Sequence, residues 1–395
     1  MSDESRAGGA GLPGQKGEPR PRQKAAPEKE IVRRIKEDGP ITFAEFMGLA
    51  LYWHEGGYYT SCPERWGKGG DYITSIDVSP AFARLLGRQT IEMWDALGRS
   101  PAFELIEAGA GRGWLSKGIL EYLKEACPEL GNSIKIRLIE KNPLLRKTPK
   151  GQVTWHEDLK ELKGPIKGVV VSNELVDSLP VHIVEQRGGL KEVFVSFDND
   201  DGSFVEVLKP PSTPAIEDYF KELDITLIEG QRAEVNLVAK EWIKEAGVLL
   251  SSGFVITIDY GLPAKELYSP ERKGSLLCHF RHTLNDNPFV NVGLQDITAH
   301  VDFTALVSSG KEAGLELTGF TTQKNFLLGL GIEEDLHEIE SVSLESLEKI
   351  NENRALGRLV APGGMGDTFK VLIQHKGIKK PELKGLSFKD MSRYL

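Results

Sequence analysis

A glycine turn between a strand pattern and a helix pattern is the feature that most constrains the fold of this chain. Residues 107–113 read Glu-Ala-Gly-Ala-Gly-Arg-Gly, follow an apolar run at 103–108, and precede a helical pattern at 114–125. Glycines at such a turn allow the backbone to approach a ligand closely at the carboxyl end of a strand. The turn therefore predicts the start of an α/β sheet that binds a nucleotide-type cofactor.

Strand and helix patterns alternate along the chain after this turn. Further strands are predicted at 135–140, 153–156, 168–172, 253–259, 315–321 and 368–374. Helices are predicted at 79–97, 232–246, 303–313 and 344–353. This alternation predicts an α/β fold in which a Rossmann-like sheet of parallel strands carries helices on both faces.

The chain divides into four predicted parts, one of which contains an insertion. They are a disordered tail (1–28), an N-terminal helical and loop segment (29–100), a Rossmann-like core (101–376) and a C-terminal tail (377–395). The tail is rich in Gly, Pro and basic residues and lacks the large apolar side chains that would order it. Within the core, a β-rich insertion at about 183–230 predicts a hairpin around residues 198–202, forming a lid or side lobe beside the ligand crevice.

Composition narrows the possible partners and the cellular compartment. The formal net charge is -9 and no basic run occurs beyond the N-terminal tail, so nucleic acid is a poor candidate partner. No apolar run approaches the roughly 20 residues that span a bilayer, so no membrane partner is expected. Cys62, Cys127 and Cys278 are far apart and lack CxxC spacing, which predicts reduced thiols in a cytoplasmic protein.

The residues around the glycine turn favour S-adenosylmethionine over a dinucleotide. The glycine spacing is GxGxG and is followed by Trp114, where a dinucleotide site needs its third glycine. Glu107 suits the ammonium and sulfonium charges of S-adenosylmethionine, whereas it would repel a pyrophosphate. Glu140 ends the second strand, where it can accept hydrogen bonds from ribose hydroxyls or be an ordinary surface acid. The predicted cofactor-binding residues are Glu107, Gly109, Gly111, Gly113, Glu140, Asp158 and Asn173.

For two of the predicted site positions, a purely structural role is an alternative to the functional one. Asp158 follows the third strand, where it can accept from an adenine amino group or cap a helix beginning at Leu159. After the fourth strand, Asn173, Glu174 and Asp177 are the predicted catalytic residues. Carboxylates at this position can orient a planar guanidinium through bidentate hydrogen bonds. The alternative is that Asn173 caps the next helix and Glu174 is solvated in its first turn.

Four side chains later in the sequence are of types that bind metals, but their spacing along the chain does not support a metal site. His279, His282, His300 and Asp302 lack the pattern of a tetrahedral site, and methyl transfer to nitrogen needs no metal. No metal site is predicted. Asp296 and Asp302 are instead expected to cap helices or to face the crevice.

Taken together, these motifs resemble the MidA-like methyltransferase family, which includes mitochondrial assembly factors for respiratory complex I. The matching stretches are residues 70–75, 107–113, 173–174 with 177, 179–182, 258–261, 279–282, 287–289 and 295–303. The resemblance covers roughly residues 30 to 376. It departs from the family pattern at Ala108 and Ala110, where Leu and Pro are common, and at Ile76-Asp77, where Pro-Glu is usual.

The resemblance implies a class I methyltransferase core with S-adenosylmethionine as cofactor. Its mitochondrial relatives look like protein arginine methyltransferases, which predicts a protein substrate methylated on an arginine nitrogen and a role in complex assembly. A non-catalytic, cofactor-binding assembly factor is the alternative, and a homodimer is possible. A nicotinamide-dependent oxidoreductase is disfavoured by Trp114 and Glu107.

Overall fold

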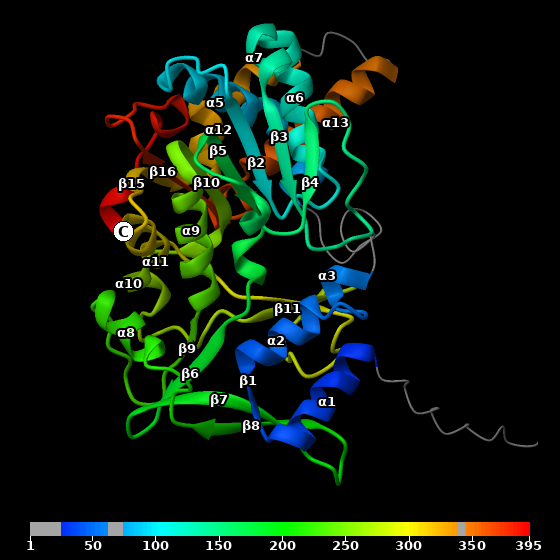
Figure 1. Ribbon diagram of the computed structural model, residues 1–395, viewed down its shortest axis with the longest axis vertical. Coiled ribbons are helices and arrows are strands. Elements are labelled where there is room, and N and C mark those ends of the chain that lie inside the picture. Colours follow the sequence, from blue (N-terminus) through cyan, green and yellow to red (C-terminus); the bar gives the residue numbers. More distant parts are fainter. Residues whose placement is uncertain (1–24, 62–73, 338–343) are drawn as a thin grey trace, which may run out of the picture.

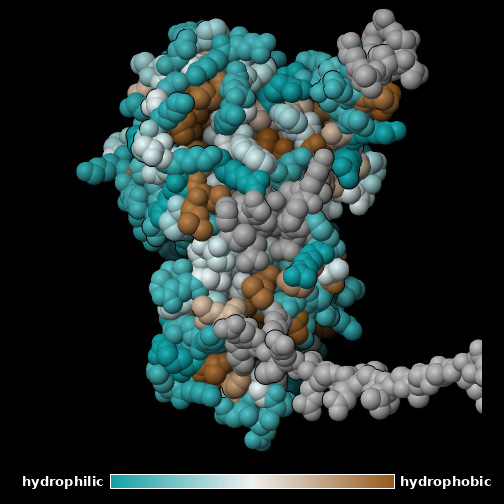
Figure 2. Space-filling view, turned by 90° about the vertical axis from the view of Figure 1, so that its right-hand side faces the viewer, coloured by the Kyte–Doolittle hydropathy of each residue, from teal (hydrophilic) through white to brown (hydrophobic). Residues whose placement is uncertain are grey.

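The computed structural model describes residues 25–61, 74–337 and 344–395. These residues form two lobes stacked along the long axis, a sheet lobe and a second lobe that contains the N-terminal helices (Figure 1). The surface in Figure 2 is mostly hydrophilic, with separate hydrophobic patches on both lobes. Within the described residues, no helix combines the length and apolarity needed to cross a membrane.

The main sheet has the strand order β15-β16-β10-β5-β2-β3-β4, and β14 pairs with β10 outside this path. Its strands are β2 (Phe103–Ala108), β3 (Lys135–Ile139), β4 (Val153–His156), β5 (Ile166–Asn173), β10 (Leu250–Leu262), β14 (Val301–Asp302), β15 (Glu316–Thr322) and β16 (Phe369–Lys376). All neighbours from β4 to β10 pair in parallel, whereas β16 is antiparallel to both β10 and β15. The predicted Rossmann-like sheet is thus confirmed, with one reversed strand.

The reversed strand corrects the expectation of an all-parallel sheet. Thr322, the last residue of β15, lies opposite Lys370 near the start of β16. The intervening helices α12 (Gln323–Gly329), α13 (Leu344–Leu359) and α14 (Met365–Thr368) therefore return the chain to the edge that it left. Since β16 begins at that edge, it must run against its neighbours.

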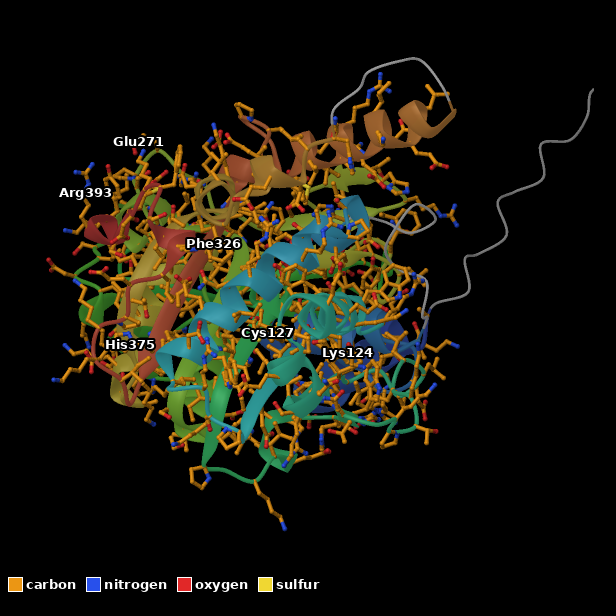
Figure 3. All side chains as sticks on the ribbon, turned by 90° about the horizontal axis from the view of Figure 1, so that it is seen from above. Lys124, Cys127, Glu271, Phe326, His375 and Arg393 are labelled. Atoms are coloured by element: carbon orange, nitrogen blue, oxygen red, sulfur yellow. The ribbon has the colours of Figure 1, made fainter. Side chains whose placement is uncertain are left out.

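Helices cover both faces of the sheet and enclose two apolar cores, as the sequence predicts. One face packs against α5 (Ala81–Ala96), α6 (Trp114–Ala126), α7 (Pro128–Ser133), α12 and α13. The other face packs against α9 (Leu237–Leu249), α11 (Phe303–Glu312) and the 3-10 helix η1 (Leu159–Glu161). Figure 3 labels Phe326 of α12, which is fully buried in the first core.

The order of the strands places a topological switch point between β2 and β5. From β2 the chain moves outward to β3 and β4, then returns to β5 on the opposite side of β2. Ala108 pairs with Ser172, and Ile258 of β10 pairs with Asn173. The turns after β2 and β5 therefore open side by side at the carboxyl edge, where α/β sheets bind ligands.

The second lobe is built on a five-stranded antiparallel sheet with the path β1-β7-β6-β9 and β8 paired to β7. Its strands are β1 (Ile41–Thr42), β6 (His182–Gln186), β7 (Leu190–Phe197), β8 (Phe204–Lys209) and β9 (Arg232–Val235). Its helices are α1 (Ala26–Asp38), α2 (Phe43–Tyr52), α3 (Tyr58–Ser61), α8 (Ala215–Glu222) and α10 (Ala264–Leu267). The predicted hairpin is present as β7 and β8. A small sheet, β12-β11-β13, adds β11 (Leu277–Phe280), β12 (Thr283–Asn285) and β13 (Asp296–Thr298).

Short elements complete the described chain. They are α4 (Ser75–Val78), η2 (Val176–Ser178), η3 (Ile332–Asp335), η4 (Lys384–Leu386) and η5 (Ser392–Tyr394). Among the described cysteines, Cys127 and Cys278 are free thiols, and Figure 3 labels Cys127 at the end of α6. Cys62 lies outside the described residues, as does the family-like stretch 70–73.

Two predicted boundaries are wrong. Helix α1 begins at Ala26, inside the predicted 1–28 tail, because Pro27 occupies its first turn and packs inward. The predicted 232–246 helix is strand β9 followed by α9, whose start is fixed by the Asn236 side chain accepting from Ala239 N at 2.8 Å. The predicted 377–395 tail does begin where β16 ends at Lys376, and it packs on β15, where Met391 N donates to Phe320 O at 2.6 Å.

Close contact between α5 and α6 gives a prediction for stability. A Cβ added at Gly118 would lie 2.6 Å from Ala83 Cβ, so Gly118→Ala should push the two helices apart. We expect a loss of about 1–3 kcal/mol in the free energy of unfolding. Gly357→Ala is the control, because no atom lies within 4 Å of its added Cβ. Thermal unfolding should show Gly118→Ala melting below, and Gly357→Ala at or above, the parent; equal melting temperatures would contradict the packing.

Candidate active site

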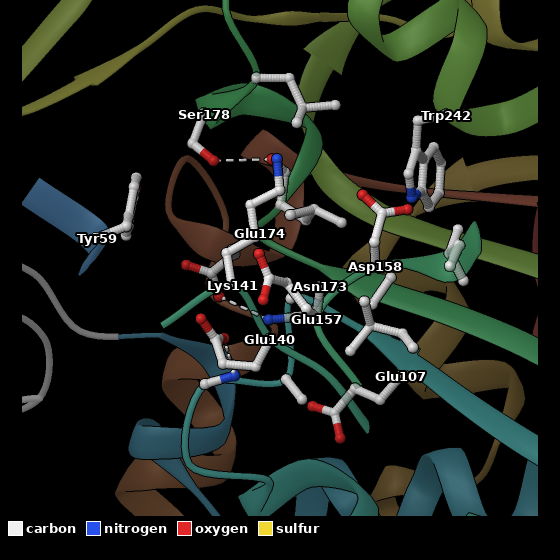
Figure 4. A pocket seen from close by; sticks show the side chains of 18 of the residues that line it. Tyr59, Glu107, Glu140, Lys141, Glu157, Asp158, Asn173, Glu174, Ser178 and Trp242 are labelled. Atoms are coloured by element: carbon white, nitrogen blue, oxygen red, sulfur yellow. Dashed lines mark hydrogen bonds between the residues drawn. The ribbon is translucent and has the colours of Figure 1, made fainter. Parts of the chain in front are cut away.

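A cavity of about 490 Å³ opens at the carboxyl edge of the sheet. Its walls come from the turns after β2, β3, β4 and β5, one side of α9 between Leu237 and Glu245, and residues of the N-terminal segment. Figure 4 shows the side chains of Glu107, Glu140, Asp158, Asn173 and Glu174 among those that line it. Six of the seven predicted cofactor residues line this cavity, with Gly113 the exception.

The glycine turn adopts a conformation that favours glycine. Gly109 and Gly111 have φ values of +71° and +53° and line the cavity. A Cβ at Gly109 would also come within 2.9 Å of Leu175 Cδ1. Gly113 precedes α6 with φ +72° and packs against Leu138 instead of facing the cavity. Gly113 thus has a packing role at the start of α6, and its contact with the cofactor stays a prediction.

Glu107 and Glu140 fix the backbone around this turn. Glu107 Oε2 accepts a hydrogen bond from Ser116 N at 3.1 Å, in the first turn of α6. Glu140 Oε2 accepts from Gly111 N and its Oε1 accepts from Asn142 N, both at 2.8 Å. Glu140 is therefore not the ordinary surface acid of the alternative interpretation.

Burial alters the acidity of both glutamates. It raises the pKa of Glu107 to about 7, although hydrogen bonds from Ser116 oppose the shift. Burial also raises the pKa of Glu140, against the opposing effect of its backbone hydrogen bonds. Each carboxylate would thus be stabilised by a positively charged ligand.

Asp158 is a helix cap that also faces the cavity. Its Oδ1 accepts from Lys160 N at 3.0 Å and caps η1. Lys160 Nζ in turn pairs with Glu245 Oε1 of α9 at 2.9 Å, which ties this wall to the adjacent helix. The capping role is confirmed, and the adenine contact stays a prediction.

Asn173 and Glu174 form a strained turn at the end of β5. Glu174 has φ +54°, and its backbone N donates to Ile258 O at 3.0 Å. Its Oε1 accepts from Asn173 Nδ2 and from Ser75 N, both at 3.0 Å. Burial raises the pKa of Glu174 to about 8. Asn173 does not cap a helix, because the next helical turn, η2, begins only at Val176.

Asp177 lies behind this turn rather than in the cavity wall. It is only 5% exposed, and burial raises its pKa to about 6. Its neighbour Asp259, at the end of β10, accepts from Leu175 N and Val176 N through Oδ2 at 3.2 and 2.9 Å. Asp259 therefore holds the backbone that follows Glu174 in place. One indication of this role is present in the sequence, because Asp259 lies in the 258–261 stretch that resembles the family. No role was predicted for Asp259 itself.

Other cavity residues were missed because they lie far from any motif. Tyr52 of α2 and Tyr59 of α3 form part of the wall, as does Trp242 of α9. The Tyr52 hydroxyl group lies 2.9 Å from Ser178 Oγ, which joins the N-terminal segment to η2. Helical periodicity in α2 and α9 predicts only core positions and cannot indicate this long-range contact.

Asp302, one of the side chains considered for a metal site, and Asp296 both have structural contacts. Asp302 caps α11 by accepting from Ala305 N at 3.0 Å, which confirms one of its two predicted roles. Asp296 accepts from the Tyr59 hydroxyl at 2.7 Å. In the part of the chain that the structure describes, no group of three or more His, Cys, Asp or Glu side chains is arranged to hold a metal ion.

The donor set of the cavity fits S-adenosylmethionine. Five carboxyl groups at this edge have pKa values that are raised by burial: those of Glu107, Glu140, Glu174, Asp177 and Asp259. None of them forms an ion pair within 4.0 Å with another described residue. The glycine backbone can approach a ligand closely, and the acids complement its ammonium and sulfonium charges.

Comparison with known proteins identifies the class. Residues 85–321, more than half of the chain, match the family described as "Putative S-adenosyl-L-methionine-dependent methyltransferase". The chain belongs to this family, and its cofactor is S-adenosylmethionine.

Individual relatives give a closer comparison for this chain. It is 31% identical to the mouse "Protein arginine methyltransferase NDUFAF7, mitochondrial", over 86% of this chain and 82% of the relative. The human protein of that name is also 31% identical, over 89% and 84%. A crystal structure from Burkholderia thailandensis with S-adenosyl-homocysteine bound has a TM-score of 0.83 at 32% identity, covering 94% of this chain and 96% of that one. The resemblance to the MidA-like family is confirmed.

The Glu140 contacts give a prediction for cofactor binding. Glu140→Gln preserves the size of the side chain but removes the charge that holds Gly111 N and complements the ligand. The dissociation constant for S-adenosyl-homocysteine should rise by about 10- to 100-fold, since hydrogen bonds to charged groups contribute roughly 1.5–3 kcal/mol. Isothermal titration provides the measurement. Glu121→Gln, on the exposed face of α6, should bind like the parent; equal affinity of Glu140→Gln would place the residue outside the cofactor site.

The pKa of Glu174 gives a prediction for stability against pH. Its folded-state pKa of about 8 exceeds the ordinary value of 4.5, so the native state holds a proton that the unfolded state has lost between these values. Stability therefore falls as pH rises from about 4.5 to 8. Glu174→Gln should remove this loss, so its melting temperature relative to the parent should increase from pH 5 to pH 8.5. A difference independent of pH would contradict the burial of this carboxyl group.

Proposed function

We propose that this methyltransferase transfers a methyl group to a guanidinium nitrogen of an arginine side chain in a protein substrate. The observation that carries the proposal is the Glu174 carboxyl group, half-buried at the cavity wall and held by Asn173 and Ser75, with no ion pair to another described residue. A guanidinium offers the charge and the paired N–H donors that such a carboxylate binds best. The mouse and human relatives are named as protein arginine methyltransferases.

The residues divide into a cofactor group and a reaction group. We propose that Glu107, Gly109, Gly111, Glu140 and Asp158 hold S-adenosylmethionine, which supplies an electrophilic methyl group on its sulfonium. Glu174 orients the guanidinium nitrogen, and Asn173 fixes the Glu174 carboxyl group by donating to Oε1 at 3.0 Å. Asp177 and Asp259 act behind them as positioning residues. Holding the reacting atoms roughly 3–3.5 Å apart provides much of the rate enhancement.

The reaction must also release one proton for each methyl group transferred. Glu174 accepts hydrogen bonds from the guanidinium and has a pKa of about 8 in the ligand-free protein. A carboxyl group whose pKa is raised toward neutrality can accept the departing proton and pass it to water. The opening of the cavity provides the route to solvent.

The relatives' names give them a mitochondrial location, which belongs to those proteins. For this chain, a cytoplasmic location, a role in assembling a protein complex and a homodimeric state are proposals based on its sequence. The four-part domain division is likewise a proposal, revised at its first boundary by the start of α1.

The substrate proposal predicts a selective loss of turnover. Glu174→Gln should bind S-adenosyl-homocysteine with nearly parental affinity but lower methyl incorporation by roughly 10²-fold or more, because it loses the charge that orients the nucleophile. The measurement is transfer of a tritiated methyl group to lysate proteins from a strain lacking this gene, followed by identification of methylarginine. Glu121→Gln should retain parental activity.

Three results would contradict the proposal or part of it. Incorporation by the parent only at lysine or at another non-arginine residue would exclude an arginine substrate. Cofactor binding without any methyl incorporation by the parent would favour the non-catalytic assembly factor. Unchanged incorporation by Glu174→Gln at saturating cofactor would remove Glu174 from the reaction centre.

A further inference from the structure

An aromatic pair in the cavity wall has no part in the function described so far. Tyr52, the last residue of α2, and Tyr59 of α3 both line the cavity. Their rings stack with centroids 5.4 Å apart and an angle of 25° between planes. Both residues belong to the N-terminal segment. In the cavity lining they lie together with the turns at the carboxyl edge of the sheet.

Hydrogen bonds at both hydroxyl groups hold the pair in place. The Tyr52 hydroxyl donates to Ser178 O at 3.2 Å and lies 2.9 Å from Ser178 Oγ. The Tyr59 hydroxyl donates to Asp296 Oδ1 at 2.7 Å. Ser178 ends η2, the helical turn that follows Glu174. The Tyr52 ring is thus fixed relative to the proposed reaction centre, with its hydroxyl group engaged at Ser178.

A lysine already occupies the position of a cation on this ring. Lys141 Nζ lies 5.2 Å from the Tyr52 ring centroid, within the range of a cation–π interaction. Lys141 directly follows Glu140 and also lines the cavity. Within the described residues its ammonium forms no hydrogen bond or ion pair, although several carboxylates surround the cavity. An ammonium held mainly by a ring face can be displaced by a better-matched cation.

We propose that the Tyr52 ring face is the binding position for the guanidinium of the substrate, and that Lys141 occupies it until the substrate arrives. This inference rests on the proposed arginine function and names the residues that would recognise the arginine. A planar guanidinium stacks on an aromatic ring while its edge remains available for a bidentate carboxylate. Tyr52 would bind the face and Glu174 the edge, whereas an ammonium such as Lys141 cannot satisfy both in this way.

The experiment measures binding of N-acetyl-arginine amide to protein saturated with S-adenosyl-homocysteine, by titration followed with NMR. Tyr52→Leu removes the ring and should weaken binding by roughly 5- to 30-fold. Tyr52→Phe keeps the ring and should stay within about twofold of the parent. Lys141→Met removes the competing cation and should strengthen binding several-fold. All three variants should retain parental affinity for S-adenosyl-homocysteine, which shows that the cavity is intact.

Each alternative result has a defined meaning. Equal binding by Tyr52→Leu and the parent would overturn the Tyr52 position, and weaker binding by Lys141→Met would overturn the displacement. Binding of the amide by neither the parent nor Lys141→Met would also overturn the inference. N-acetyl-lysine amide separates the two proposals: if it shows the Tyr52 dependence and the arginine amide does not, a cation position exists but the arginine function fails.

Discussion

A cluster of buried or half-buried carboxyl groups at the carboxyl edge of the sheet, none of them ion-paired with another described residue, is the constraint on which the site depends. Glu107, Glu140 and Glu174 line one cavity, and Asp177 and Asp259 lie behind it. Burial raises the pKa of all five because a charged carboxylate loses hydration there. Backbone N–H groups hold the carboxyl groups in place, and a cationic ligand would favour their charged forms. This arrangement sacrifices stability for binding, as functional sites commonly do.

The fold creates this concentration of charge through its topology. Three turns that are distant in sequence meet because β3, β2 and β5 are adjacent, parallel and end at the same edge. Asp259 then supports the turn at Glu174 from the neighbouring strand. The N-terminal segment contributes the opposite wall through Tyr52 and its contact with Ser178. The second lobe thus belongs to the site rather than being a separate appendage.

Local patterns in the sequence predicted much of the sheet and part of the site. The bounds of β2 and β4 match, because short apolar runs bordered by glycine or polar turns are strong strand signals. The antiparallel direction of β16 was not predicted, nor was the division of the predicted 232–246 helix into β9 and α9 at Asn236. Both depend on tertiary packing, which sets the direction of strand pairing and the position of helix caps. Gly113 was assigned to the cofactor from spacing alone, whereas its φ and its contact with Leu138 give it a packing role. Tyr52 and Asp259 needed contacts across the fold.

The most direct test of the central claim is the number of protons released on ligand binding at pH 7. Titration calorimetry in buffers of different ionisation enthalpy measures it for S-adenosylmethionine and for S-adenosyl-homocysteine, which lacks the sulfonium charge. The pKa values of about 7 for Glu107 and about 8 for Glu174 mean that both are partly protonated at this pH. The charged cofactor should therefore release more protons than its neutral-sulfur counterpart. If the two ligands release equal numbers of protons, the claim that cationic ligands complete this acidic site is contradicted.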